Sequence, residues 1–184
     1  MDNVALGTDA RVPEDDMTRG LAIARPDDAE LVHLAVVGDT YTVLLSGDQT
    51  QGRFAMLDML IPTGSGPPPH RHTFEECFRM LEGSVEVQLR DSPPVRLDVG
   101  ESANIPANAL HSFRNTGQTT ARLLCLVAPA GLERFFAEFV DPVATRTSPA
   151  SALSDAERAE RLERAMAVAP AYGMEVLPPP GHQA

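Results

Sequence analysis

The side chains most able to do chemistry lie in one stretch of the sequence, from Gly64 to Gly83. His70 and His72 are separated there by one residue, and Glu76 follows four positions after the second histidine. On a β-strand the side chains at i and i+2 point to the same face, so the two imidazoles can bind one ion together. Two imidazoles and one carboxylate are the ligand type of non-heme iron and related divalent metals. This stretch therefore predicts a site for one divalent transition metal ion.

A fourth ligand is expected on a later strand. His111 comes five residues after Pro106, and antiparallel closure of a sheet would bring it opposite the first pair of histidines. His33 and His182 have no partner at ligand spacing, and we leave both outside the site. Imidazole and carboxylate ligands suit iron, manganese, nickel, cobalt and zinc, so the sequence does not choose among these metals.

These ligands must be positioned by a β-rich body. Between Leu31 and about Ala130, β-forming runs alternate with turn signals such as Ser46-Gly47-Asp48. Strands are expected at 39–45, 53–61, 77–81, 84–89, 94–97, 102–105, 111–115 and 122–128. Many short strands at regular spacing indicate a sandwich or a barrel. The 16 prolines and 13 glycines, against 5% aromatic residues, also favour an all-β class.

Beyond residue 130 the periodicity changes to that of helices. A stripe at i, i+3, i+4 and i+7 indicates an amphipathic helix between Gly131 and Pro142; its members are Leu132, Phe135, Phe136 and Phe139. A second helix begins at a capping box formed by Ser154 and Glu157 and is expected to stop at Pro170. Its apolar face comprises Leu162, Ala165, Met166 and Ala169.

The length of 184 residues suits one domain with short appendages. We predict an N-terminal arm at 1–29, a β-barrel at 30–130, and C-terminal helices followed by an extended tail at 131–184. The tail ends in the run Pro178-Pro179-Pro180-Gly181.

The amino-acid composition limits the kinds of binding partner that are expected. Fifteen basic residues against 26 acidic ones give a formal net charge of -11, so nucleic acid and anionic membrane surfaces should be repelled. A small-molecule partner is favoured instead. The N-terminus shows no leader pattern, and no apolar stretch approaches the roughly 20 residues of a membrane span, so a cytoplasmic protein is expected. Cys77 and Cys125 are expected to be buried thiols without a functional role.

The metal-binding stretch resembles the first motif of the cupin superfamily. That motif, G-x5-H-x-H-x3-E-x6-G, is matched at every spacing by Gly64, His70, His72, Glu76 and Gly83. The resemblance implies an all-β fold, the cupin jelly-roll β-barrel, here with short C-terminal helices. It also implies that His70, His72, Glu76 and His111 hold the metal.

The second cupin motif, G-x5-P-x-G-x2-H-x3-N, is matched by Gly100, Pro106, His111 and Asn115. Asn108 stands where the motif has its middle glycine. Asparagine tolerates a positive φ better than other non-glycine residues do, so the turn is expected to form with altered local geometry at most.

Within the superfamily the chain looks most like small bacterial single-domain cupins of the quercetin 2,3-dioxygenase-like type. The segments that carry this likeness are 38–41 (Gly-Asp-Thr-Tyr), 67–72 (Pro-Pro-Pro-His-Arg-His) and 177–181 (Leu-Pro-Pro-Pro-Gly). The likeness implies a metal-dependent dioxygenase acting on an apolar aromatic or enolisable small molecule. Glu76 is then the catalytic residue, which either remains a ligand or takes a proton.

Two other functions use the same ligands. A redox-silent isomerase, epimerase or lyase would use the ion only as a Lewis acid that polarises a carbonyl. A non-catalytic cupin would only bind or sense a small molecule, but no effector or DNA-binding domain is evident in the sequence.

An apolar pocket beside the metal is expected to bind the substrate. Strand alternation places Phe78 and Met80 on the face of Glu76, and Phe113 on the face of His111. The predicted substrate-binding residues are Phe78, Met80, Phe113, Met56 and Phe54, with core packing as the competing interpretation for most of them. Glu75 is interpreted as a solvated carboxylate.

A homodimer is expected. The N-terminal arm and the aromatic stripe of residues 132–139 are segments that a barrel of this size would not bury alone, and closed two-fold dimers are the commonest soluble oligomers. The stripe has three interpretations that the sequence does not separate: it covers the barrel mouth, packs on a partner, or docks on the sheet.

Overall fold

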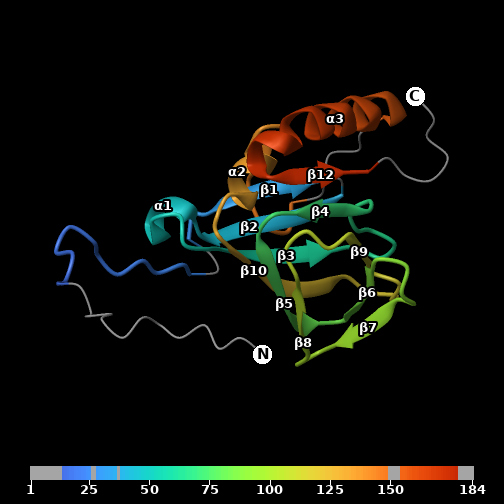
Figure 1. Cartoon of the computed structure of the whole chain (residues 1–184), viewed down its shortest axis with the longest axis horizontal. Helices are drawn as coiled ribbons and strands as arrows, with labels where there is room; N and C mark the ends of the chain where they lie inside the picture. The colour runs from blue at the N-terminus through green and yellow to red at the C-terminus, as the bar shows by residue number, and fades with distance from the viewer. Residues whose placement is uncertain (1–13, 26–27, 37, 149–153, 178–184) are drawn as a thin grey trace.

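The computed structural model describes residues 14–25, 28–36, 38–148 and 154–177, and within them two antiparallel sheets form a barrel (Figure 1). The larger sheet has the order β11-β1-β2-β3-β10-β5-β8. Its strands are β1 (Val32–Val36), β2 (Asp39–Leu45), β3 (Ala55–Ile61), β5 (Glu75–Glu82), β8 (Ser102–Ile105), β10 (Ala121–Ala128) and β11 (Pro142–Val143). The all-β jelly-roll class predicted from the sequence is confirmed.

The smaller sheet carries most of the predicted ligands. Its order is β12-β4-β9-β6-β7, and its strands are β4 (His70–His72), β6 (Ser84–Leu89), β7 (Val95–Asp98), β9 (His111–Arg114) and β12 (Met174–Val176). The two sheets face one another, and the core lies between them.

Strand alternation builds this core. In β10 every second side chain is buried, beginning with Ala121 and ending with Val127, while the residues between them are partly exposed. The inward side chains of facing strands then meet. Phe78 of β5 and Phe113 of β9 contact edge to face with ring centroids 5.2 Å apart, an arrangement that aromatic pairs prefer.

The expected strand bounds agree with the structure to within two residues. β2, β6 and β8 begin and end where predicted. One difference is the segment after β2, where a turn was expected at 46–48. The structure has a short helix there, α1 (Gly47–Thr50), because Ser46 and Gln49 form a capping box that satisfies its first backbone N–H groups.

The C-terminal part contains the two expected helices, α2 (Leu132–Ala137) and α3 (Asp155–Val168). The predicted capping box begins α3: the Glu157 backbone N–H donates to Ser154 Oγ at 3.3 Å, and the Ser154 N–H donates to the Glu157 carboxylate at 2.7 Å. Helix α3 ends before Pro170, and a 3-10 helix, η1 (Ala169–Tyr172), continues the chain. Met166, expected on the apolar face, is 37% exposed.

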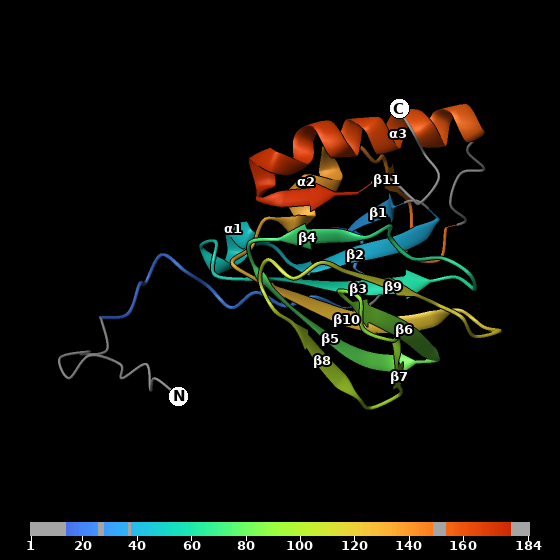
Figure 2. The same cartoon turned by 45° about the vertical axis from the view of Figure 1, so that its right-hand side comes forward.

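Two short strands near the C-terminus were not predicted. β11 pairs with β1, and β12 pairs with β4. Figure 2 shows α3 lying across α2 and β12 on one side of the barrel. The C-terminal segment is thus joined to both sheets, while the proline run at 178–180 lies outside the described residues.

The aromatic stripe is buried within the chain itself. Phe135 is 2% exposed, Phe136 9% and Phe139 7%. The Phe136 ring contacts Tyr41 of β2 with centroids 5.1 Å apart, and Phe135 contacts Tyr172 of η1 at 5.9 Å. This stripe therefore gives no reason for a second subunit.

The described part of the N-terminal arm, residues 14–25, projects past α1 (Figure 1). Polar contacts hold it there: the Arg19 guanidinium donates to the Gln49 carbonyl at 3.1 Å, and the Gln51 amide donates to Asp16 at 3.3 Å. The apolar side chains of the arm face solvent, with Met17 85% and Leu21 87% exposed.

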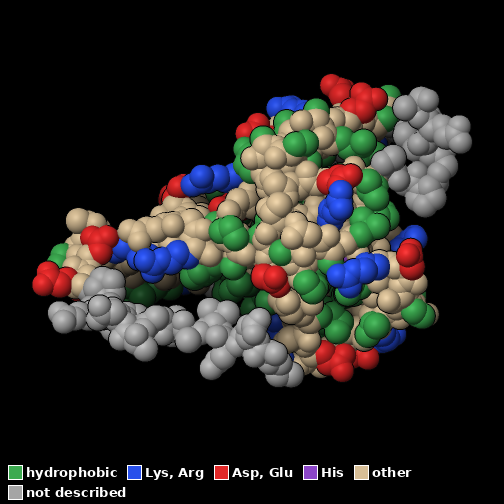
Figure 3. All heavy atoms as spheres, viewed as in Figure 1, with side chains coloured by type: hydrophobic (Ala, Val, Ile, Leu, Met, Phe, Trp, Pro, Cys, Tyr) green, Lys and Arg blue, Asp and Glu red, His purple; other side chains and the backbone are tan. Residues whose placement is uncertain are grey.

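Acidic and basic side chains are interspersed over the face of the molecule shown in Figure 3. Among the described residues, no helix has the length and apolar character needed to cross a membrane.

We propose that the arm of residues 14–25 packs on a second copy of the chain, because Met17 and Leu21 are the most exposed of the large apolar side chains that the structure describes. Light scattering is expected to give the mass of a dimer. Leu21→Asp should shift the equilibrium toward monomer, since burying a carboxylate in an apolar contact is unfavourable. Val99→Asp, a change at a 60% exposed apolar residue after β7, is the control and should leave the mass unchanged. A monomer mass at all concentrations would rule out the dimer.

Candidate metal centre

The four predicted ligands converge between the two sheets. β4 turns His70 and His72 inward and leaves Arg71 exposed, as the i, i+2 spacing requires. His70 pairs in register with His111 of β9, and Glu76 reaches the same point from β5 of the larger sheet. The ligand atoms all lie within 4.8 Å of one another, and all four residues are buried.

Each imidazole is oriented by a backbone carbonyl. The Nδ1 atoms of His70, His72 and His111 lie 2.9, 2.8 and 2.9 Å from the carbonyl oxygens of Pro68, Phe74 and Ala109. A carbonyl oxygen can only accept a hydrogen bond, so the proton of each neutral ring is on Nδ1 and the lone pair is on Nε2. The Phe74 ring also stacks on His72, with centroids 3.9 Å apart and planes 3° from parallel. The rings are therefore fixed with their Nε2 lone pairs facing the centre.

At the centre of the four-residue group, hydrogen-bond acceptors face one another with no proton between them. Glu76 Oε2 lies 3.3 Å from His72 Nε2 and 3.2 Å from His111 Nε2. A carboxylate has no proton to donate, and neither does an Nε2 whose ring carries its proton on Nδ1. A positive ion between these atoms would satisfy all of them at once. The donor set thus fits a divalent metal, and the outer carbonyls are the kind of support that orients histidine ligands.

The charge state of Glu76 agrees with this arrangement. Burial acts to raise the pKa of its carboxyl group, but hydrogen bonds from His111 and His72, with protons in the place of the ion, outweigh burial and hold the pKa below its usual range. A cation in that place acts in the same direction. Cys125, which is fully buried, donates its S–H to Glu76 Oε1 at 3.2 Å. Cys125 is therefore buried as expected and also supports a ligand, which the sequence did not indicate. Cys77 is only partly buried, and both thiols are free.

The imidazole of His70 is held neutral. Burial lowers its pKa to about 4, and the neighbouring His111 acts in the same direction. A neutral imidazole is the form that binds a metal, so His70 keeps its lone pair available throughout the neutral pH range.

The loop between β8 and β9 is anchored on both sides of the site. Asn108 adopts φ 65, the left-handed conformation expected at this position, and its N–H donates to the His72 carbonyl at 2.6 Å. Glu75 is exposed and accepts hydrogen bonds from Asn104 at 2.8 Å and from the Ala107 N–H at 3.1 Å. Glu75 thus holds the loop that leads to His111 and lies outside the metal group.

A cavity opens from the metal group toward the C-terminal helices. Its polar residues are His70, His72, Glu76, Asp39, Tyr41 and Arg161. The other walls are formed by Val36, Met59, Gly66, Pro67, Pro68, Leu132, Phe135, Phe136, Phe139, Leu162, Ala165, Met174 and Val176. Of the three interpretations of the aromatic stripe, the structure shows the one in which it covers the mouth of the barrel.

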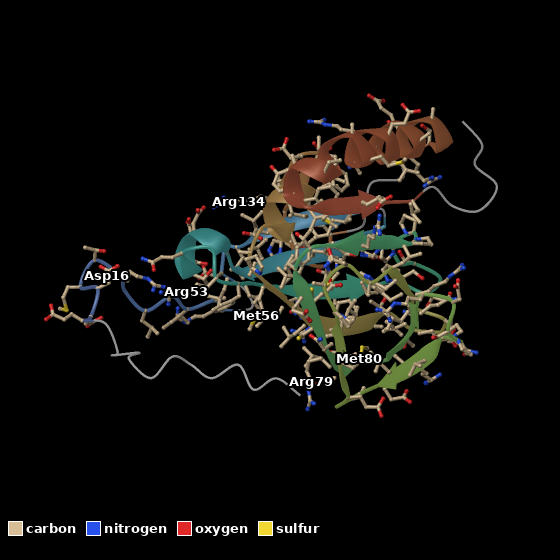
Figure 4. All side chains as sticks on the ribbon, viewed as in Figure 1. Asp16, Arg53, Met56, Arg79, Met80 and Arg134 are labelled. Atoms are coloured by element: carbon tan, nitrogen blue, oxygen red, sulfur yellow. The ribbon has the colours of Figure 1, made fainter. Side chains whose placement is uncertain are left out.

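The predicted substrate-binding residues do not line this cavity. Phe78, Met80 and Phe113 are buried in the core, and Figure 4 shows Met80 at the end of the barrel away from α3. Their strand faces are as expected, because Phe78 and Met80 are buried on the same side of β5 as Glu76. Phe78 and Met80 follow Glu76 along β5. Phe113 lines a neighbouring cavity, which shares residues 66–68 and Leu162 with the first.

Phe54 and Met56 also lie away from the cavity, for a different reason. The inward face of β3 comprises Ala55, Leu57, Met59 and Ile61, so Met56 is on the opposite face and Phe54 precedes the strand. Asp58 shares the face of Met56 and marks it as the outer face of the barrel, a signal that the prediction did not use. Met59 is the β3 residue that the cavity contains.

The remaining histidines are apart from the site. His33 is buried on β1, where its Nδ1 lies 2.7 Å from Thr42 Oγ1, and it does not belong to the metal group. His182 lies outside the described residues.

Replacing one ligand should lower metal content and stability together. His72→Ala removes an Nε2 donor, and metal that binds only the folded chain stabilises it by about 2.7 kcal/mol at one hundred times its Kd. For a chain of this size the loss corresponds to a fall in Tm of roughly 5 to 10 °C. Elemental analysis and calorimetry on the same sample measure both. His33→Ala is the matched control and should keep the metal; full metal content in His72→Ala would refute the ligand assignment.

Comparisons with known proteins agree with this fold and site. The cupin domain family matches residues 57–127. Quercetin 2,3-dioxygenase from Bacillus subtilis (strain 168) is 27% identical over 147 residues, which cover 74% of this chain and 42% of that protein. The chain therefore spans less than half the length of this curated relative.

Two solved structures share the fold. The polyketide cyclase RemF from Streptomyces resistomycificus is 21% identical, with a TM-score of 0.53 over 74% of this chain and 89% of its own. An RmlC-like cupin from Shewanella frigidimarina is 17% identical, with a TM-score of 0.53 over 64% of this chain and 99% of its own. Together with the two motifs and the barrel, these matches show that the chain contains a cupin domain and resembles quercetin 2,3-dioxygenase-like proteins.

Proposed function

We propose that the chain is a metal-dependent dioxygenase that acts on an apolar aromatic or enolisable small molecule. The observation that carries the proposal is the position of the metal group, which forms the polar part of an otherwise mainly apolar cavity. A pocket of this kind binds an apolar ligand through its walls and orients it through a few polar groups. The similarity to quercetin 2,3-dioxygenase supports the reaction class.

In this proposal the metal ligands and the aromatic residues have separate roles. The three histidines and Glu76 hold the ion, which when bound supplies Lewis acidity and, if redox-capable, a route for electrons between substrate and dioxygen. The aromatic side chains of α2 exclude water from the reacting groups. They also offer flat apolar contact to a conjugated ring system.

Glu76 is the proposed catalytic residue. Its Oε2 atom contacts two imidazoles and its Oε1 atom accepts the Cys125 S–H. The carboxylate is held ionised in a buried position, so it can accept a proton from the bound substrate during turnover.

Oxygen consumption tests the proposed function. Protein purified without oxygen and analysed for metal is expected to take up dioxygen when a flavonol or another enolisable compound is added. The rate should depend on a redox-capable metal, so zinc-loaded protein should be inactive. Equal turnover by zinc-loaded protein under nitrogen would replace the dioxygenase with the Lewis-acid isomerase or lyase.

Glu76→Gln should impair turnover far more than substrate binding. The amide keeps the size of the side chain but cannot accept a proton as the carboxylate does, and loss of a general base lowers the rate by roughly 100-fold or more. Turnover is measured per bound metal ion, so that weaker metal binding is not mistaken for a slower reaction. Glu75→Gln changes the adjacent exposed carboxylate and is the matched control, with turnover expected to be unchanged. Equal rates for the two variants would show that Glu76 has no catalytic role.

A further inference from the structure

A second carboxyl group lies in the metal cavity and has no role in the function proposed above. Asp39 is the first residue of β2 and belongs to the Gly38–Tyr41 segment. Its exposed fraction is 2%, and it lines the cavity without being one of the four metal-group residues. A buried carboxyl group requires partners, because an isolated charge in an apolar interior is strongly unfavourable.

The partners of Asp39 are both hydroxyl groups. The Tyr41 hydroxyl donates to Asp39 Oδ2 at 2.9 Å, and the Ser65 hydroxyl donates to Oδ1. A hydroxyl can donate or accept, so both partners remain satisfied whether Asp39 is a carboxylate or a neutral acid. The environment of Asp39 therefore tolerates the gain and the loss of a proton.

A second buried aspartate in the same sheet shows the contrasting arrangement. Asp58 of β3 is 5% exposed and binds the Arg122 guanidinium through contacts of 2.7 and 2.9 Å. Arg146 lies 3.5 Å from the same carboxylate. A guanidinium only donates and keeps its charge, so the oxygens of Asp58 act as acceptors in an ion pair. Asp58 is thus built as a structural ion pair, whereas Asp39 is not.

The pKa of Asp39 is shifted from its ordinary value. Burial raises its pKa to about 7, although the hydrogen bonds from Ser65 and Tyr41 act to lower it. An acid or base is most effective when its pKa is near the working pH. The other titratable or charged side chains that line the same cavity are His70, His72, Glu76, Tyr41 and Arg161.

We propose that Asp39 is a catalytic residue that exchanges a proton with the substrate. This inference rests on the proposed function for the substrate class, an enol or a phenol. The substrate O–H bond breaks, its electron pair stays on the substrate oxygen, and the proton forms a new O–H bond with the Asp39 carboxylate. The products are a substrate oxyanion and a neutral Asp39, which later returns the proton. The step needs no oxidant.

Proton release on binding tests this role without turnover. Zinc-loaded protein is titrated with the flavonol quercetin under nitrogen at about pH 8, above the pKa of Asp39, in buffers of different ionisation enthalpy. The wild type should release almost no proton to the buffer, because Asp39 takes it. Asp39→Asn should release about one more proton per site. The asparagine side chain is nearly isosteric, and both hydroxyls can pair with it, so metal content is expected to stay unchanged.

Asp58→Asn is the matched control. It changes a buried aspartate outside the cavity, so it should lower Tm and leave the proton count at the wild-type value. Equal proton release by wild type and Asp39→Asn would overturn the proposal. Loss of metal in Asp39→Asn would also overturn it, because Asp39 would then be a support of the ligands.

A second measurement separates this proposal from the proposed function. Infrared difference spectra between about pH 6 and pH 8 should show a protonated carboxyl group that disappears as pH rises. The signal should persist in Asp58→Asn and be missing in Asp39→Asn; its absence from the wild type would overturn the proposal regardless of any ligand. A titrating Asp39 in protein that neither binds quercetin nor consumes oxygen would overturn the proposed function and still support an acid–base group in the cavity.

Discussion

The lone pairs of three imidazole nitrogens and one carboxylate point at a single buried volume, and a cation there would satisfy all four groups at once. Three of the four predicted ligands are imidazoles, and contacts on the side away from the centre fix each ligand in place. Carbonyl oxygens orient the three rings, Phe74 stacks on His72, and Cys125 contacts the outer oxygen of Glu76. The barrel brings these groups together because β4 and β9 belong to one sheet and β5 to the other. The two sheets therefore have to close on each other for the site to form.

The interior of the barrel has two regions, a packed core and the cavity at the metal group. Around Phe78 and Phe113 the side chains pack on one another and form an apolar core. On the side of the metal group, α2, α3 and β12 line a cavity. Packing in the first region stabilises the fold, while the second leaves the ligands accessible to a small molecule. Apolar residues near a ligand in sequence can thus belong to either region.

The sequence predicted the ligands because their geometry is local. Strand alternation places His70 and His72 on one face, and the structure brings Glu76 and His111 within reach of them. The cavity walls depend on long-range pairing instead. Met174 lies opposite His72 only because β12 adds to the edge of β4, and a strand of three residues has too little pattern to be predicted. The choice of Met56 was wrong for another reason. Met56 and Met59 are equally apolar, but Asp58 lies on the face of Met56 and marks that face as the outer one.

Burial also shifts the acid–base properties of two residues that line the cavity. His70 and Asp39 carry opposite shifts from one cause, since burial lowers the pKa of an imidazole and raises that of a carboxyl group. Both shifts favour neutral forms, and in both cases the neutral form is chemically useful. For Asp39 the same shift has a consequence for stability. Its pKa is higher in the folded chain than the ordinary value of 3.8, so the folded state binds more protons than the unfolded state between about pH 4 and 7, and stability falls as pH rises through that window. Asp58 of the same sheet instead has a guanidinium partner, Arg122, in an ion pair. Asp39 has hydroxyl partners in place of a guanidinium, so its surroundings can accommodate either protonation state in the cavity that the metal group also lines.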